Sequence, residues 1–248
     1  MQDWYRNWFN SPYYYQLYDN RNEKEASDFI HALMGFLKPS AGVKMLDAAC
    51  GKGRHSVELA EMGFEVTGID LSENSISEAQ QNQAPNLEFY VHDMRLPFRI
   101  NFFDYVFNFF TSFGYFPSQR ENDNVIRSIG SALKLNGTFV IDYLNVQYAK
   151  LHLIPRYTKR AGNVNFEVTK WQDEFHFFKK IRVDDPALKE PLIFTERVAK
   201  FSLGDFTEML SYRGMQVKEV FGDYRLNPYS FHDSPRLIIV AEKIRIAL

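Results

Sequence analysis

The chain has 248 residues, of which 45% are hydrophobic and 24% charged, and its formal net charge is -2 at pH 7. This composition suits one globular α/β domain with an insertion; it argues against repeat arrays, disordered chains and proteins that coat nucleic acid. No apolar run approaches the ~20 residues that span a bilayer, the N-terminal segment carries charges where a signal peptide is apolar, and the single Cys50 excludes an intrachain disulfide and a Cys-based zinc cluster. We therefore expect a cytoplasmic protein without a metal site.

Helices and strands alternate over most of the chain, a pattern typical of a parallel sheet covered by helices. Helix ends are marked by Gly63, by Ser72 as an N-cap, and by Ser118 with Glu121 as a capping box. The predicted helices cover residues 23–37, 54–62, 72–82 and 118 to a stop at Asn136-Gly137. The predicted strands cover residues 43–48, 64–69, 87–91, 105–109 and 138–143.

The alternation ends at about residue 147, and residues 147–200 show a period of two. Val164, Phe166 and Val168 share one face, and a polar turn over residues 172–174 precedes a second such run over residues 175–183. These features predict an inserted antiparallel sheet. Ser202 with Asp205 then caps a helix to about residue 213, and residues 215–221 and 237–242 form two final strands, interpreted as a hairpin pair.

The segment that indicates function is the buried strand over residues 43–48, which carries Asp47 near its end and continues through Ala49, Gly51 and Gly53 into a helix. Small residues there let a ligand approach the backbone, and a helix N-terminus offers free N–H groups. The dinucleotide motif G-x-G-x-x-G would place Ala49, Gly51 and Arg54 at its glycines, so two of three fail, and Asp47 would repel a pyrophosphate. A ligand with a cationic end and no phosphate, such as S-adenosylmethionine, fits this segment better.

With these residues the chain resembles the class I S-adenosylmethionine-dependent methyltransferases of the small-molecule type. Acidic residues follow three successive strands, and the resemblance implies that each contacts a different part of the cofactor. Asp47 and the turn are implied to hold the methionyl end, Asp70 the ribose, and Asp93 the adenine. Ala49 replaces the first glycine of the family's turn, which weakens the match slightly. The implied cofactor-binding residues are Asp47, Ala49, Gly51, Gly53, Asp70, Leu71, Asp93, Met94 and Asn108.

The resemblance implies a Rossmann-like, seven-stranded, mostly parallel sheet with helices on both faces, a C-terminal antiparallel hairpin, and an antiparallel β lid inserted after strand five. The expected units are residues 1–146, with an N-terminal helical segment and the cofactor-binding core; residues 147–200, the lid; and residues 201–248, the end of the core sheet. The implied reaction is in-line transfer of the methyl group of S-adenosyl-L-methionine, which leaves S-adenosyl-L-homocysteine.

The methyl acceptor is less readable, because positioning can carry in-line transfer without a catalytic base. Aromatic side chains crowd the segments that select the acceptor in the family, and a ring beside a sulfonium is favourable. The candidates for the acceptor pocket are Tyr14, Tyr18, Phe113, Tyr115, Tyr143 and Asn145. We expect a small-molecule acceptor, no membrane partner, and a monomer or homodimer.

Three alternatives remain open at this stage. The insert carries 11 Lys plus Arg against 7 Asp plus Glu, with Lys179, Lys180 and Arg182 clustered, so RNA or protein methylation stays an alternative. A non-catalytic S-adenosylmethionine-binding protein is the second. A nicotinamide-dependent oxidoreductase is the third, and the missing glycines argue against it.

Overall fold

The structure is a computed structural model that describes residues 4–18 and 23–245. The helices are α1 (Trp4–Phe9), α2 (Pro12–Tyr18), α3 (Glu23–Leu37), α4 (Arg54–Glu61), α5 (Glu73–Ala79), the short 3₁₀ helix η1 (Gln80–Asn82), α6 (Gln119–Ala132), α7 (Val146–Leu151) and α8 (Leu203–Tyr212). The strands are β1 (Lys44–Ala48), β2 (Glu65–Asp70), β3 (Leu87–Val91), β4 (Phe103–Asn108), β5 (Leu133–Leu144), β6 (Arg156–Ala161), β7 (Val164–Gln172), β8 (His176–Asp184), β9 (Leu192–Ala199), β10 (Met215–Phe221) and β11 (Arg236–Lys243).

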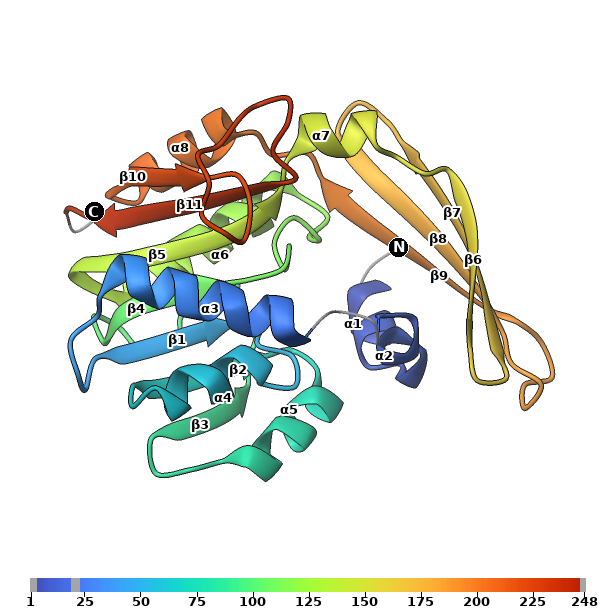
Figure 1. Ribbon diagram of the computed structural model, residues 1–248, viewed down its shortest axis with the longest axis horizontal. Coiled ribbons are helices and arrows are strands. Elements are labelled where there is room, and N and C mark those ends of the chain that lie inside the picture. The colour runs from blue at the N-terminus through green and yellow to red at the C-terminus, as the bar shows by residue number, and fades with distance from the viewer. Residues whose placement is uncertain (1–3, 19–22, 246–248) are drawn as a thin grey trace.

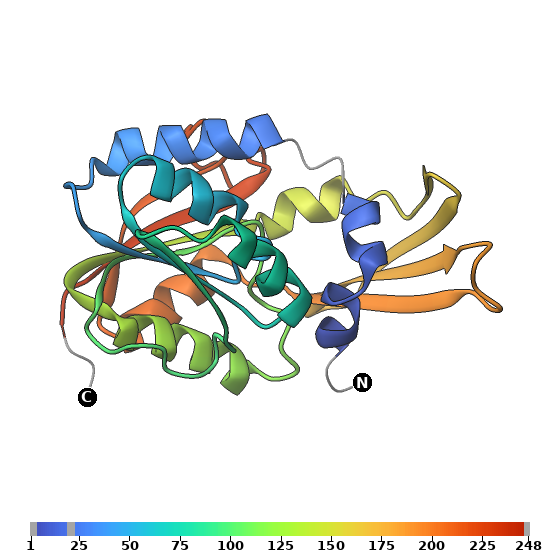
Figure 2. The ribbon, with the colours of Figure 1, turned by 90° about the horizontal axis from the view of Figure 1, so that it is seen from below.

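Seven strands form the central sheet in the order β10-β11-β5-β4-β1-β2-β3. Only β11 runs antiparallel to its neighbours, β5 and β10, which confirms the predicted Rossmann-like sheet and the direction of its last strand. Helices α3, α4 and α5 cover one face of this sheet, and α6 and α8 cover the other (Figure 2). The carboxyl ends of β1, β2, β3 and β4 therefore open at one edge, where open α/β sheets bind ligands.

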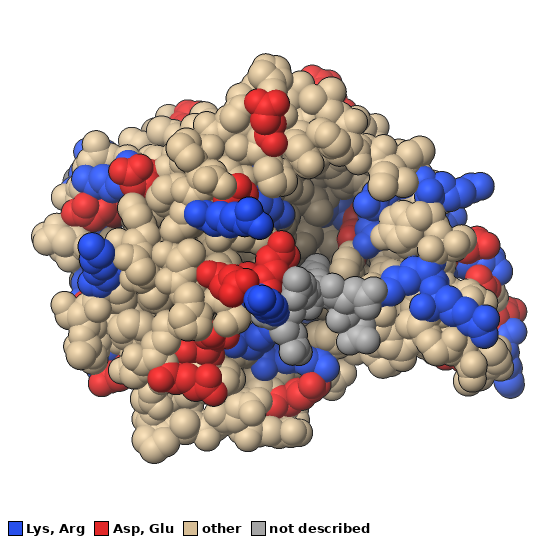
Figure 3. Space-filling model, in the orientation of Figure 1, with Lys and Arg blue, Asp and Glu red and all other residues tan. Residues whose placement is uncertain are grey.

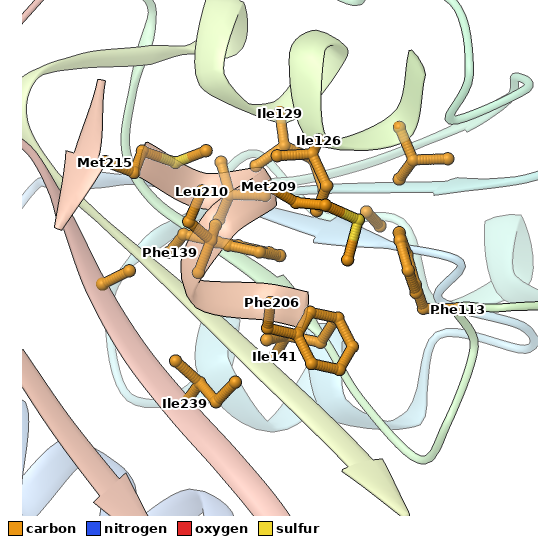
Figure 4. Close-up of a cluster of buried hydrophobic side chains, with 14 of the residues drawn as sticks. Phe113, Ile126, Ile129, Phe139, Ile141, Phe206, Met209, Leu210, Met215 and Ile239 are labelled. Carbon is orange, nitrogen blue, oxygen red and sulfur yellow. The ribbon is translucent and has the colours of Figure 1, made fainter. Parts of the chain in front are cut away.

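Packing of aromatic and aliphatic side chains under α6 and α8 anchors this edge of the sheet (Figure 4). The ring of Phe206 in α8 lies 5.5 Å from Phe113 and 5.1 Å from Tyr143, and all three side chains are fully buried. The capping box of Ser202 with Asp205 starts α8 at the position predicted from the sequence. The buried rings thus fix the segment that follows β4 and the end of β5.

The insert folds into the second sheet, in the order β6-β7-β8-β9, and is called the lid sheet below. It stands beside the core, and α1 and α2 lie between the two (Figure 1). The inner face of the lid sheet buries Phe166 and Ile181 against Trp8 of α1 and Leu17 of α2. The N-terminal helices therefore belong to the hydrophobic core of the lid as much as to the central domain.

Two predicted boundaries are wrong. Helix α6 ends at Ala132 instead of continuing to Asn136-Gly137, because Leu133 already has extended backbone and pairs with Phe103 of β4. Regular pairing resumes at Thr138, so the Asn-Gly pair marks an irregularity within β5 and not a helix stop. The insert begins with the short helix α7 instead of a strand, because the side chain of Asn145 caps it at Gln147 N. Within the described ranges, no helix is both long and apolar enough to cross a membrane.

Candidate functional site

A cavity of about 480 Å³ lies at the carboxyl ends of β1 to β4, roofed by α1 and α2. In the space-filling view the surface is hollowed between the core and the lid sheet (Figure 3). The lining combines one side of acidic and small residues with another of aromatic rings. It consists of Tyr5, Phe9, Tyr14, Tyr15, Tyr18, Ala49, Cys50, Gly51, Lys52, Arg54, His55, Asp70, Leu71, Ser75, Glu78, His92, Asp93, Met94, Phe109, Phe110, Ser112, Tyr115 and Phe116.

The turn after β1 requires left-handed backbone at three positions, with φ of 65° at Ala49, 57° at Gly51 and 80° at Gly53. A Cβ on Gly53 would lie 2.5 Å from the Phe89 ring, so glycine is required there by packing beneath the turn. A Cβ on Gly51 would meet only the Tyr15 hydroxyl at 4.0 Å. Gly51 therefore leaves its backbone open to the cavity, as the sequence motif predicts for a ligand-binding turn.

Asp70, at the end of β2, lines the cavity and holds two backbone amides. One carboxylate oxygen accepts from Gly51 N at 2.9 Å and the other from Ser72 N at 2.8 Å. Burial raises the pKa of Asp70, and these hydrogen bonds oppose that effect. The carboxylate thus ties the turn after β1 to the start of α5 and faces the cavity between them.

Asp47 lies deeper than the sequence motif suggests. Its side chain is 1% exposed, accepts a hydrogen bond from Ser56 Oγ at 2.7 Å, and does not line the cavity. Desolvation raises the pKa of Asp47 to about 7, although the Ser56 bond and the charge of Arg54 work against it. Asp47 and Gly53 therefore shape the turn from below instead of facing the cavity.

Asp93, which follows β3, lines the cavity beside Met94 and forms an ion pair with Arg95. Arg95 donates to both of its carboxylate oxygens, the shortest contact being 2.6 Å, and Arg6 of α1 approaches to 3.9 Å. Burial raises the pKa of Asp93, but bonding to Arg95 outweighs it and leaves the pKa below its usual range. The carboxylate is therefore ionised at neutral pH.

Asn108, at the end of β4, lies just beneath the cavity. Its amide nitrogen donates to Ala48 O at 2.9 Å, while its buried Oδ1 has no hydrogen-bond partner among the described residues. A buried polar atom without a partner costs free energy unless a ligand or water reaches it. Asn108 therefore connects the end of β4 to the end of β1 behind the cavity lining.

The predicted acceptor residues divide into two groups. Tyr14, Tyr18 and Tyr115 line the cavity, as expected. Phe113 and Tyr143 do not, because both are fully buried against α8, where the Tyr143 hydroxyl donates to Ala199 O.

Asn145 also lies outside the cavity lining. It caps α7, and its amide nitrogen donates to Ser234 O at 2.8 Å. Phe113, Tyr143 and Asn145 therefore lie outside the lining of this cavity.

Several residues that line the cavity were not expected from the sequence. Arg54 and His55 lie in the first turn of α4, and both line the cavity. His55 stacks on Phe110 at 5.0 Å with an interplanar angle of 16°, and Arg54 lies 5.4 Å from the same ring. Only the pairing of α4 with the loop after β4 brings these groups together, so no local signal could have revealed them.

Helices α1 and α2 connect the cavity to both halves of the molecule. On the core side, the Tyr15 hydroxyl and Ser75 Oγ are 2.6 Å apart, and Lys52 Nζ lies 3.8 Å from the centre of the Tyr15 ring. On the lid side, Trp8 Nε1 and the Tyr18 hydroxyl both donate to Glu196 of β9, at 2.7 and 2.6 Å. In the sequence, the three consecutive tyrosines at positions 13–15 mark α2 as an aromatic segment.

Comparison with known proteins identifies the fold and its family. The family described as Methyltransferase domain matches residues 39–183. YqeM of Bacillus subtilis (strain 168), whose name places it among methyltransferases, is 38% identical over 214 residues, which cover 81% of this chain and 84% of YqeM. Glycine N-methyltransferase of Rattus norvegicus is 27% identical over 150 residues, or 54% of this chain and 51% of that enzyme.

Solved structures agree with this result at the level of fold. An S-adenosylmethionine-dependent methyltransferase from Clostridium acetobutylicum ATCC 824 superposes with a TM-score of 0.76 at 17% identity, covering 93% of this chain and 95% of the other. The sugar N-methyltransferase KedS8 from Streptoalloteichus sp ATCC 53650 gives a TM-score of 0.71 at 17% identity, covering 92% of each chain. The chain belongs to the class I S-adenosylmethionine-dependent methyltransferases.

Proposed function

We propose that this enzyme methylates a small-molecule acceptor bound in the cavity beneath α1 and α2. The observation that carries the proposal is the shape of the site. The cavity of about 480 Å³ is roofed by Tyr14, Tyr15 and Tyr18, which α2 holds between the core and the lid sheet. Such a volume is typical of a pocket that encloses small ligands. A folded RNA or a protein surface would have to displace this roof to reach the turn after β1.

The residues on the cofactor side fit S-adenosylmethionine. Gly51 leaves room for a ligand against its backbone. Asn108, which lies behind the lining, donates to Ala48 O and so supports the start of this turn. We assign the ribose to Asp70, and the adenine to Asp93 with Met94 and Leu71, all of which line the cavity.

Two residues of the turn take a different part in this assignment. Asp47 and Gly53 support the turn from below instead of contacting the methionyl end. Ala49 lines the cavity beside Gly51 and completes the backbone surface on which that end would lie.

The aromatic residues on one side of the cavity would assist methyl transfer by excluding water and by stabilising positive charge. Bound S-adenosylmethionine supplies an electrophilic methyl group on a sulfonium. The rings of Tyr14, Tyr115 and Phe110 exclude water, and their electron-rich faces favour a cation beside them. Positioning of the acceptor against these rings therefore supports in-line displacement without a dedicated base.

The names of structural relatives support a small acceptor. CalS10 from Micromonospora echinaspora is an amino pentose methyltransferase with a TM-score of 0.68 at 18% identity, covering 94% of this chain and 97% of that one. KedS8 is a sugar N-methyltransferase, and glycine N-methyltransferase acts on glycine by its name. The names of all three proteins indicate small acceptors, which is the chemistry proposed here.

The basic insert gives less support to nucleic acid as the substrate. Lys180 and Arg182 alternate along β8 with the buried Ile181 and Val183, so they lie on the outer face of the lid sheet, away from α1 and α2. Arg182 is also neutralised by Asp184, at 2.9 Å. Lys and Arg side chains gather over the lid (Figure 3), yet Lys180 and Arg182 do not face the cavity.

The test combines binding with transfer of a labelled methyl group. Calorimetric titration with S-adenosylmethionine, S-adenosylhomocysteine and NADH is expected to show binding of the first two alone. Tritiated S-adenosylmethionine is then offered with three separate pools: the small-molecule filtrate of a cell extract, total RNA and total protein. We expect label in the filtrate. Label only in RNA or only in protein would favour that macromolecule instead, and binding without transfer to any pool would indicate a non-catalytic binding protein.

A further inference from the structure

The loop after β4 holds two consecutive residues in a backbone conformation that non-glycine residues avoid. Phe110 has φ of 56° and Thr111 has φ of 59°. The left-handed region is unfavourable for residues with a Cβ and a true outlier for a β-branched residue such as threonine. Such strain persists only where surrounding structure imposes it, and it tends to occur at functional sites.

A buried carboxylate in β5 imposes this conformation. Asp142 is fully buried, and its Oδ2 accepts from Phe110 N at 2.8 Å, while its backbone oxygen accepts from Thr111 N at 2.9 Å. The Tyr224 hydroxyl donates to the same Oδ2 at 3.0 Å. One residue therefore accepts a hydrogen bond from both strained amides.

Arg236 at the start of β11 completes the arrangement and connects it back to the loop. Its Nε donates to Asp142 Oδ1 at 2.7 Å, and its Nη2 donates to Thr111 Oγ1 at 2.8 Å. The Arg236 side chain is 19% exposed, so it compensates the Asp142 charge from the edge of the buried region. A planar fork can make both contacts in fixed geometry, which a lysine cannot do.

The loop held in this way forms the aromatic wall of the cavity. The Phe110 ring stacks on His55 at 5.0 Å on one side and lies 5.2 Å from the Tyr224 ring on the other. Ser112, the next residue after the strained pair, also lines the cavity. A change in the Phe110–Thr111 backbone would move the Phe110 ring away from His55.

We propose that Asp142 and Arg236 are positioning residues for methyl transfer: their ion pair holds Phe110 and Thr111 in left-handed conformation and so places the Phe110 ring at the acceptor side of the cavity. The inference rests on the proposed function. Neither Asp142 nor Arg236 lines the cavity, so both act through the loop. Their removal should therefore reduce turnover more than cofactor affinity.

Thr111→Val is the most informative variant. Loss of Arg236 would leave Asp142 as an uncompensated buried charge and would itself impair folding. Valine keeps the β-branched shape of Thr111 and leaves the ion pair intact, removing only the contact from Arg236 Nη2 to the loop. Thr111→Ser restores a hydroxyl and is the rescue variant. Thr207→Val is the matched control, because the Thr207 hydroxyl is exposed and bonds only Leu203 O in its own helix.

Three quantities are measured on each full-length protein. They are the hydrogen-exchange rates of the Phe110 and Thr111 amides by NMR, the dissociation constant for S-adenosylhomocysteine, and the rate of tritium transfer from S-adenosylmethionine to the small-molecule filtrate. For Thr111→Val we expect the two amides to exchange about tenfold or more faster and the rate of tritium transfer to fall by about tenfold or more. The dissociation constant for S-adenosylhomocysteine should stay within about threefold of wild type. Thr111→Ser should recover most of the turnover, and Thr207→Val should match wild type.

Two outcomes overturn the proposal. Unchanged exchange and turnover in Thr111→Val would mean that Arg236 does not hold the loop through Thr111. Equal losses of turnover, cofactor affinity and thermal stability would mean a general structural role. A wild-type protein that transfers no methyl group to any pool would instead overturn the proposed function, while the exchange rates of the two amides would still decide whether Arg236 and Asp142 hold the loop.

Discussion

At the scale of single residues, the carboxylates of the cofactor side differ in what they already bind. Asp70 faces the cavity while holding Gly51 N and Ser72 N, whereas Asp47 is enclosed beneath the turn with Ser56. The pKa of each carboxylate follows from this placement. Asp70 is positioned to contact a ligand, and Asp47 acts through the shape and charge of the turn.

Asp70→Ala should weaken binding of S-adenosylmethionine, because the variant loses the acceptor assigned to two ribose hydroxyls. Two hydrogen bonds to a charged group, at about 1.5 to 3 kcal/mol each, correspond to about a hundredfold or greater rise in Kd. Calorimetric titration measures this change. Asp28→Ala, at an exposed position of α3, is the matched control and should bind normally. Unchanged affinity in Asp70→Ala would refute the ribose assignment.

Asp47 should make the folding stability dependent on pH. Its pKa is about 7 in the folded protein against 3.8 as a reference, so between these values the unfolded chain ionises first and binds fewer protons. Linkage then makes the free energy of unfolding fall as pH rises from about 4 to about 7, by about 4 kcal/mol at most. The stabilising contribution of protonation is complete below pH 4 and absent above pH 7.

The measurement for Asp47 is denaturant unfolding of wild type and Asp47→Asn between pH 4 and pH 8. Asparagine cannot ionise but keeps an acceptor for Ser56 Oγ. The stability of wild type relative to Asp47→Asn is expected to fall across this range. A constant difference between the two proteins would show that Asp47 ionises normally in the folded state.

Gly53→Ala should destabilise the turn after β1. Alanine would adopt φ of 80° with its Cβ 2.5 Å from the Phe89 ring, so both backbone strain and overpacking apply, at roughly 1 to 3 kcal/mol each. Gly204→Ala is the matched control, because Gly204 lies in α8 and its Cβ would have ordinary contacts. That change should stabilise by about 0.4 to 1 kcal/mol. Thermal unfolding measures the stability of both variants. Equal melting temperatures would contradict the packing argument for Gly53.

At the scale of elements, α1 and α2 form the roof of the cavity although neither contributes to the central sheet. The two helices are hydrogen-bonded to both sides of the cavity. Tyr15 bonds Ser75 of α5 in the core, whereas Trp8 and Tyr18 bond Glu196 of β9 in the lid sheet. The roof is short, with six residues in α1 and seven in α2, so it depends on tertiary contacts for its stability. Such an element can control how fast a ligand leaves.

Tyr15→Phe should increase the dissociation rate of S-adenosylhomocysteine. The variant keeps the ring over Lys52 but loses the contact between the hydroxyl and Ser75 Oγ, and one neutral hydrogen bond of about 0.5 to 1.5 kcal/mol allows up to about a tenfold change. Stopped-flow displacement measures the rate. Tyr212→Phe, whose hydroxyl bonds Glu208 on the exposed side of α8, is the control. A Tyr15→Phe rate equal to that of the control would rule out a roof that limits release.

At the scale of the whole molecule, α1 joins the lid sheet to the central domain. Trp4 and Phe9 pack against the apolar clusters of both, and Trp8 lies within the cluster of the lid sheet. This side chain is fully buried, packs against the inner face of the lid sheet, and donates to Glu196 at 2.7 Å. The lid is therefore an integral part of the fold and not a separate appendage. Perturbing this contact should affect the stability of the entire chain.

Trp8→Phe should lower the free energy of unfolding by about 1 to 3 kcal/mol, because Glu196 loses a donor in a partly buried place. Trp171→Phe is the matched control: Trp171 is 41% exposed and stacks on Phe178 at the opposite face of the same sheet. Trp171→Phe should change the free energy of unfolding by no more than about 0.5 kcal/mol. Denaturant unfolding compares the two, and similar losses would show that Trp8 does not couple the lid to the core.

The sequence by itself determined the features that depend on neighbouring residues. The capping boxes at Ser118 and Ser202 start α6 and α8 where predicted, because a cap involves residues only three positions apart. The strand that carries Asp47 near its end and the turn through Gly51 and Gly53 indicated the fold and its cofactor for the same reason. Alternation of hydrophobic residues also predicted the inserted sheet.

Only the tertiary structure decided which side chains face the cavity. Tyr115 lines it whereas Phe113, two residues earlier, is buried under α8, and no local pattern distinguishes these two rings. The pairing of Arg236 with Asp142 joins residues 94 positions apart in sequence. Local hydrogen bonds and periodicity involve residues within a few positions, whereas the direction of a side chain in a loop depends on packing among strands that meet only in the folded sheet.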